Sequence, residues 1–230
     1  MKKKKSLLTR IYTEGPGEDF IKKDDSWTSI LFSDPFSIPL TRFLSKFKRI
    51  HPNHITIIAL IPAFIAVYFF IRGQLFYGAI FYLLNFIIDG IDGKLARLTK
   101  KFSKHGATLD YYTDRIRNFA LYFSFWYSQY YLHGQWLFGG GIIFAHYVLM
   151  VFGFLFITKF TYKTIFPRVY SYYAPIDEGF LTFFFAPLIN QVVLLLPILI
   201  LLQFLSYMIL FFIQKEKPNF KTRFRDMLKI

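Results

Sequence analysis

Two pairs of aspartates are the residues of this 230-residue chain best suited to chemistry. Asp89 and Asp92 are three residues apart, and Asp110 and Asp114 are four residues apart, so each pair occupies one face of a helix. Both pairs adjoin long apolar runs, where charged side chains are costly to bury and usually functional. If the two faces meet, the four carboxylates form a cage of oxygen atoms.

Such a cage predicts a site for divalent cations. Four clustered carboxylates cannot all stay ionised without cations, and Mg²⁺ and Mn²⁺ prefer oxygen ligands. Two bridged ions could clamp a pyrophosphate and activate a hydroxyl group. The alternative is that the carboxylates form structural ion pairs with nearby basic side chains, but ion pairs would not require the glycines of this region. These basic residues are Lys94, Arg97, Arg115 and Arg117.

Small residues accompany the aspartates at helical spacing. Gly93 and Ala96 lie on the same stripe as the first aspartate pair, and Gly106 lies one turn before the second pair. Small side chains leave room for a ligand to approach the helix backbone, although they also allow close packing of helices. Arg97 follows this stripe, and its planar guanidinium suits phosphate oxygens.

This region resembles the signature of the CDP-alcohol phosphotransferases, also called CDP-alcohol phosphatidyltransferases. Residues 89–114 meet every specified position of the pattern D-x2-D-G-x2-A-R-x8-G-x3-D-x3-D. Residues 52–56, which precede the first long apolar run, resemble the family more loosely. The resemblance implies a membrane enzyme of phospholipid biosynthesis that transfers a substituted phosphate, in the expected case phosphatidyl, from a CDP-linked alcohol to an acceptor alcohol and releases CMP.

The resemblance also implies roles for individual residues. Two ions of Mg²⁺ or Mn²⁺ would be held by Asp89, Asp92, Asp110 and Asp114. Asp114 would in addition be the catalytic general base that accepts the proton of the acceptor hydroxyl. The CDP part of the donor would contact Gly93, Ala96, Arg97 and Gly106. Because family members are often dimers, a homodimer is a further expectation from the resemblance.

The acceptor alcohol is less narrowly defined. One basic set could bind a phosphorylated acceptor such as inositol phosphate or glycerol phosphate, or could merely mark the cytoplasmic side. This set comprises Arg115, Arg117, Lys159, Lys163 and Arg168. Family members that act on phosphorylated inositol carry an arginine in the fifth helix, which this chain lacks.

The fifth predicted helix instead opens with the acidic residues Asp177 and Glu178. These could suit an amine-bearing alcohol, or place negative charge at a helix N-terminus. The lysine at position 94 of the motif resembles the residue found there in the choline and ethanolamine branch of the family. That branch uses a CDP-headgroup donor and a diacylglycerol-like acceptor, and it stays open as the alternative.

The composition indicates a membrane protein. Hydrophobic residues make up 54% of the chain, its mean hydropathy is +0.37, and it contains 31 Phe, 16 Tyr and 3 Trp. The absence of cysteine excludes disulfides, thiolate metal sites and cysteine nucleophiles. The net charge is +14, but the sequence contains no nucleic-acid-binding motif. We therefore expect the positive charge to attract anionic lipid and not nucleic acid.

The apolar runs predict an all-α fold with six transmembrane helices. Four runs cover about residues 55–71, 75–91, 107–132 and 137–158, and one longer run covers 180–213. A single helix over that last run would be about 51 Å long against a hydrocarbon core of about 30 Å, so it must turn, near Asn190.

A basic amphipathic helix is predicted over residues 36–50, with Pro39 in its first turn. We expect it to lie on the membrane surface. The alternative is that it packs on a soluble partner. The chain then divides into a cytoplasmic segment (1–50), a six-helix catalytic domain (51–214) and a basic cytoplasmic tail (215–230).

The basic residues predict the orientation. Of the 28 lysines and arginines, all but Arg72 fall on one side of a six-helix topology. The positive-inside rule therefore places both termini and the active site in the cytoplasm, in a multi-pass protein of the cell membrane.

Two other functions compete with this interpretation. A membrane prenyltransferase also uses aspartate pairs and Mg²⁺, but it needs more helices than this chain supplies. A divalent-cation carrier should hold its carboxylates near the bilayer midplane, whereas these four adjoin the cytoplasmic lysines Lys100, Lys101 and Lys104.

Overall fold

The computed structural model describes residues 25–134, 144–145, 147–148, 171–172, 175–190, 192, 198, 200–201, 204–205 and 208. The predicted fourth and sixth transmembrane helices fall mostly outside these residues. Lys159, Lys163 and Arg168 lie outside them altogether, so their predicted role is not tested by the structure.

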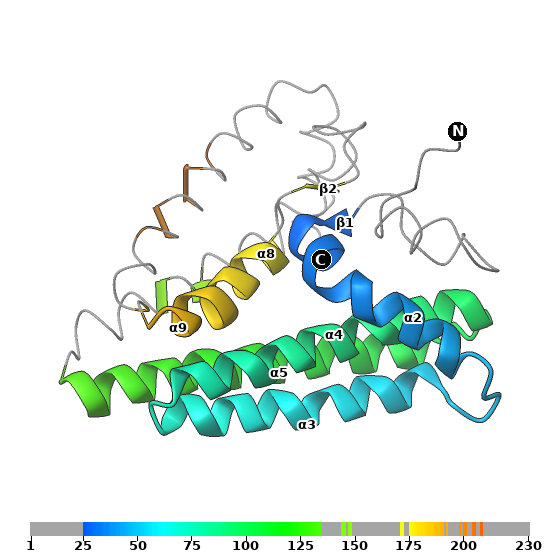
Figure 1. Cartoon of the computed structure of the whole chain (residues 1–230), viewed down its shortest axis with the longest axis horizontal. Helices are drawn as coiled ribbons and strands as arrows, with labels where there is room; N and C mark the ends of the chain where they lie inside the picture. Colours follow the sequence, from blue (N-terminus) through cyan, green and yellow to red (C-terminus); the bar gives the residue numbers. More distant parts are fainter. Residues whose placement is uncertain are drawn as a thin grey trace, which may run out of the picture.

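The described part of the chain is mostly helical, which agrees with the predicted all-α class. Three long helices lie side by side: α3 (Pro52–Ile71), α4 (Leu75–Thr99) and α5 (Lys104–His133) (Figure 1). Both α4 and α5 pack along α3, while α2 (Asp34–Leu44) packs against α4. A short parallel bridge joins β1 (Asp25–Ser26) to β2 (Ser171–Tyr172), with Asp25 opposite Ser171.

Two of the helices are long and apolar enough to cross a membrane. They are α3, with 20 residues, and α4, with 25 residues, whose most apolar 18-residue stretches have mean hydropathies of 2.3 and 1.4. Only 39% and 33% of their most apolar stretches are buried within the protein, as expected for helices that contact lipid. The 30-residue α5 carries both Asp110 and Asp114 and is more polar.

Helices α3 and α4 both extend beyond the predicted apolar runs. The first begins at Pro52, where the Nδ1 atom of His51 accepts a hydrogen bond from the Asn53 amide at 3.3 Å. The second continues eight residues past the predicted end at Ile91, because Ile91 and Leu95 stay buried as the helix turns polar. Residues 89–97 are therefore helical throughout, as the spacing of the motif requires.

The amphipathic helix differs from its predicted bounds. A π-helical turn, η2 (Ser29–Ser33), leads directly into α2, which ends at Leu44 and not at residue 50. The prediction that Pro39 lies in the first turn was wrong, since it lies in the helix interior. The helix starts early because small polar residues bury its first turns against α4, including Ser33 and Ser37.

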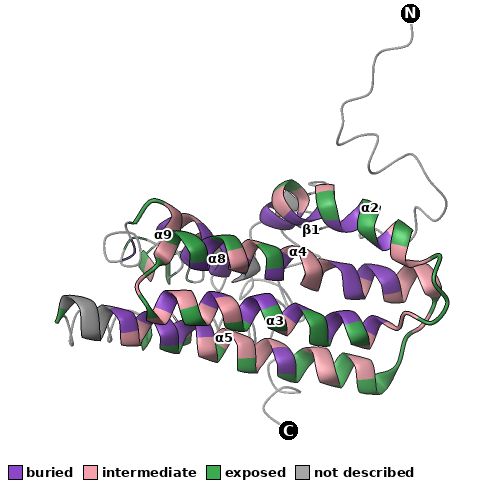
Figure 2. Ribbon diagram, turned by 60° about the horizontal axis from the view of Figure 1, so that its bottom comes forward, coloured by how far each residue is buried: buried purple, intermediate pink, exposed green. Residues whose placement is uncertain are grey.

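The core is rich in phenylalanine. Phe70 of α3 contacts Phe125 of α5 with ring centroids 4.6 Å apart, and Phe125 contacts Phe183 at 5.1 Å. Phe183 belongs to a segment in which α8 (Pro175–Phe180) runs on through the π-helical η5 (Leu181–Phe185) into α9 (Ala186–Leu188). Buried positions accordingly follow the facing sides of these helices in Figure 2.

A turn follows this segment where the sequence predicted one. The helix ends at Leu188, and Asn190 has a left-handed φ of 55°. Asparagine tolerates that conformation better than most residues, which explains why the long apolar run breaks here.

A buried ion pair fixes α2 on α4. The Lys94 ammonium lies 2.8 Å from a carboxylate oxygen of Asp34, with side chains 6% and 2% exposed, and it also donates to the Gly90 carbonyl at 2.9 Å. Gly90 allows η2 to pack closely on α4, because a Cβ at Gly90 would lie 2.4 Å from the Ser33 hydroxyl oxygen.

We predict that Lys94→Met lowers the thermal unfolding temperature in detergent, because it leaves the Asp34 carboxylate buried without its ammonium partner. Breaking a buried pair in this way costs about 3–5 kcal/mol. The double variant Asp34→Asn/Lys94→Met should recover most of the loss. A single variant as stable as the wild type would show that the pair does not hold α2.

Candidate active site

Helices α4 and α5 bring three of the four predicted metal ligands together. One carboxylate oxygen from each of Asp89, Asp92 and Asp110 lies within 4.8 Å of the other two, and all three side chains are partly buried. Their elements explain the approach, since α4 and α5 both pack on α3 and direct these side chains toward each other. A cluster of carboxylate oxygens of this kind fits Mg²⁺ or Mn²⁺.

Asp92 is held in place by α3 and by its own helix. The Thr56 hydroxyl donates to Asp92 Oδ2 at 2.6 Å, and the Gly93 amide donates to Oδ1. Thr56 is buried and was not among the predicted site residues. Its place in residues 52–56, which loosely resemble the family, was the signal that could have identified it.

Asp114 is not part of the three-aspartate group. Arg117 lies between it and Asp89: Nη1 donates to Asp89 Oδ1 and Nη2 contacts Asp114 Oδ1, each at 2.7 Å. The ion-pair alternative is therefore correct for Arg117. It is wrong for Lys94, which pairs with Asp34 instead.

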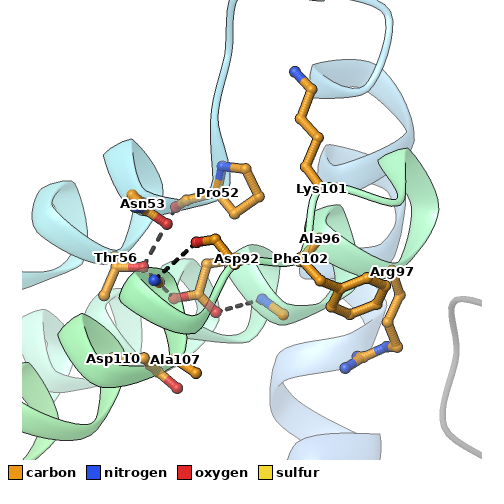
Figure 3. A pocket seen from close by; sticks show the side chains of 13 residues that line it. Pro52, Asn53, Thr56, Asp92, Ala96, Arg97, Lys101, Phe102, Ala107 and Asp110 are labelled. Atoms are coloured by element: carbon orange, nitrogen blue, oxygen red, sulfur yellow. Dashed lines mark hydrogen bonds between the residues drawn. The ribbon is translucent and has the colours of Figure 1, made fainter.

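A cavity of about 170 Å³ adjoins the aspartates (Figure 3). All four residues predicted to bind CDP line it, together with two of the aspartates: Gly93, Ala96, Arg97, Gly106, Asp92 and Asp110. The sequence did not predict the other lining residues, which are Pro52, Asn53, Thr56, Lys101, Phe102, Ser103 and Ala107. The cavity thus lies where the first turns of α3 and α5 meet the last turns of α4.

Close contacts fix the walls of this cavity. A Cβ at Gly106 would lie 2.7 Å from the Asn53 Oδ1 atom, so the Asn53 side chain fits against α5 here because residue 106 has no side chain. The Lys101 ammonium donates to the carbonyls of Lys48 and Ile50 at 2.7 and 3.2 Å. These bonds tie the link between α4 and α5 to the loop that precedes α3.

Two described residues that the sequence analysis considered for the acceptor make contacts within the protein. Asp177 is fully buried and accepts hydrogen bonds from the Thr28 amide and hydroxyl at 3.1 and 2.5 Å, which favours a structural role at the start of α8. The Arg115 guanidinium lies 4.6 Å from the centre of the Tyr111 ring.

Comparisons with known proteins agree with this geometry. A family model described as CDP-alcohol phosphatidyltransferase matches residues 49–214. The chain is similar to an archaetidylinositol phosphate synthase of Pyrococcus horikoshii, with 39% identity over 75 residues that cover 32% of this chain and 39% of the relative. It is also similar to a phosphatidylinositol phosphate synthase of Streptomyces avermitilis, with 31% identity over 93 residues that cover 39% and 38%. The matched stretches thus span about two fifths of each relative's length.

We predict that Thr56→Val weakens the binding of Mn²⁺ about 10-fold, because residues that orient a metal ligand commonly contribute this much to affinity. Thr56→Ser keeps the hydroxyl and should bind Mn²⁺ like the wild type. The measurement is titration with Mn²⁺ in detergent, followed by the electron paramagnetic resonance signal of free Mn²⁺. Equal affinity in all three proteins would show that Thr56 does not orient Asp92.

Proposed function

Because this chain belongs to the CDP-alcohol phosphatidyltransferase family, we propose that it transfers a phosphatidyl-type group from a CDP-linked lipid to a polar alcohol and releases CMP. Family membership makes it a transferase of substituted phosphate groups and removes the prenyltransferase and cation-carrier interpretations. The observation that carries the proposal is the cavity lined by Gly93, Ala96, Arg97 and Gly106 directly beside the clustered aspartates.

The proposed metal ligands are Asp89, Asp92 and Asp110, with Asp114 as the fourth. We propose two ions, Mg²⁺ or Mn²⁺. When bound, such ions neutralise charge on a diphosphate and make CMP a better leaving group. The protein's contribution is to hold the oxygen ligands in place, which Thr56 supports through its hydrogen bond to Asp92.

The cavity would hold the CDP part of the donor. Gly93, Ala96 and Gly106 carry too little side chain to fill it, and Arg97 places a guanidinium on its wall for phosphate oxygens. Neutral lining residues such as Asn53 and Ser103 offer hydrogen-bonding groups to the nucleotide.

Asp114 would act as the general base. Its carboxylate accepts the proton of the acceptor hydroxyl while the hydroxyl oxygen forms a bond to the phosphorus that carries the lipid. The bond from this phosphorus to the bridging oxygen breaks, and CMP leaves with the electron pair.

Inositol phosphate is the first acceptor to test, because both similar proteins are named for products that contain inositol phosphate. Its phosphate would need basic partners, for which we propose Arg115, Lys159, Lys163 and Arg168. No lysine or arginine occurs in residues 175–190, so the fifth helix does not supply one. Lys94 pairs with Asp34 within the protein, so its presence in the motif is explained without a choline-type donor, and that donor stays the alternative.

The membrane topology that we propose is the one that the sequence predicts. We propose six transmembrane helices in a catalytic domain over residues 51–214, with a cytoplasmic segment before it and a basic tail after it. Both termini and the active site would face the cytoplasm of a multi-pass cell-membrane protein, and a homodimer is part of the proposal. The apolar side chains of α2 support its proposed position on the membrane surface, since Phe36 and Phe43 are 60% and 53% exposed.

We predict that the purified protein with Mg²⁺ releases CMP from a CDP-activated lipid in the presence of inositol phosphate, but not of inositol. Glycerol phosphate and serine are the comparison acceptors, and CDP-diacylglycerol and its ether-linked counterpart are the two donors. Release from CDP-choline with diacylglycerol would instead support the choline-type alternative. The proposal fails if no pair releases CMP and Mg²⁺-dependent binding of CDP is also absent.

We predict that Asp114→Asn reduces turnover by about 100- to 10,000-fold, because an amide cannot accept the hydroxyl proton. The affinity for CDP should stay within a few-fold of the wild type, because Asp114 does not line the cavity and the three aspartates that lie together are unchanged. Turnover is followed as CMP release and affinity by isothermal titration calorimetry. An active Asp114→Asn enzyme would remove the assignment of the base.

A further inference from the structure

Arg117 connects two carboxylates that the proposed function uses differently. Its Nη1 atom is 2.7 Å from Asp89, at the edge of the three-aspartate group, and its Nη2 atom is 2.7 Å from the proposed base Asp114. The Arg117 side chain is 13% exposed, so water screens these contacts only weakly. Arg117 lies outside the signature pattern, which ends at Asp114.

The two contacts have different physical consequences. A guanidinium on Asp89 neutralises a charge that would otherwise attract a metal ion, and it occupies one oxygen of that carboxylate. A guanidinium on Asp114 restricts the rotamer of its carboxylate, because the planar fork offers both nitrogens in one geometry. The same side chain therefore opposes cation binding and orients the base.

We infer that Arg117 is a positioning residue that holds Asp114 in place for proton transfer and competes with divalent cations for Asp89. This inference rests on the proposed function, since it takes Asp114 as the base and Asp89 as a metal ligand. Arg117 acts through the two aspartates and not by contact with the substrate.

Removing the guanidinium should change the two properties in opposite directions. Without its positive charge the carboxylates repel each other more strongly, and Asp89 becomes fully available, so cations bind more tightly. Asp114 loses its fixed orientation, so turnover falls. A residue that merely stabilised the fold would lower metal affinity and turnover together when removed.

The test is Arg117→Gln in the full chain, with Arg72→Gln as a control of equal charge change. Arg72 caps the opposite end of α3, where it lies over the Tyr68 ring. Mn²⁺ affinity is measured on the protein without substrate by the resonance signal of free Mn²⁺. We expect Arg117→Gln to bind Mn²⁺ at least 3-fold more tightly, while CMP release at saturating donor and Mn²⁺ falls about 10-fold. Arg72→Gln should match the wild type in both measurements.

Two further variants separate the roles of Arg117. Arg117→Lys keeps the charge but not the fork, so it should retain the wild-type Mn²⁺ affinity and still lose turnover. This variant also tests the inference if Arg117→Gln does not fold. In the Asp114→Asn background, Arg117→Gln should no longer lower turnover, although it should still raise Mn²⁺ affinity.

The outcomes distinguish this inference from the proposed function. If the wild type binds Mn²⁺ and releases CMP but Arg117→Gln binds Mn²⁺ equally or more weakly, the inference alone is overturned. If the wild type neither binds Mn²⁺ nor releases CMP, the proposed function fails and the inference fails with it.

Discussion

Mutual repulsion among the aspartates at one end of α4 and α5 is the constraint on which this structure depends. Three carboxylates place oxygens within 4.8 Å of one another, and a fourth is linked to them through Arg117. Such a group is stable only beside cations, so the surrounding residues must supply positive charge or bind it. A ligand rich in phosphate and its metal ions meet the same need, which connects the electrostatics of the site to its chemistry.

Two kinds of packing hold the helices around these aspartates. Away from the site, rings such as Phe70, Phe125 and Phe183 pack α3, α5 and η5 into an apolar core. Around the site, polar contacts replace them: Thr56 to Asp92, and the Lys101 ammonium to the loop before α3. Polar contacts are directional, so they orient ligand side chains in a way that apolar packing cannot.

The proposed position of α2 on the membrane surface would link the site to that surface. The Asp34–Lys94 pair joins α2 to the same stretch of α4 that carries Asp92 and Gly93. The buried face of α2 is mostly polar, with Ile38 as its one large apolar side chain, while Phe36 and Phe43 are exposed. A helix of this kind can lie at an interface and still hold a fixed position against the protein, which would keep the cavity at the depth of a lipid headgroup.

The sequence alone determined the features that depend on spacing within one helix. The shared faces of the aspartate pairs, the small residues beside them and the turn at Asn190 follow from helical periodicity and local backbone preference. It could not determine which basic residue meets which carboxylate, since all of these partners except Asp114 and Arg117 lie on different elements. Only the tertiary structure paired Lys94 with Asp34, placed Arg117 between Asp89 and Asp114, and brought Thr56 to Asp92. The helix α2 also begins earlier than predicted, because burial of its first turns against α4 outweighed the preference of Pro39 for a first helical turn.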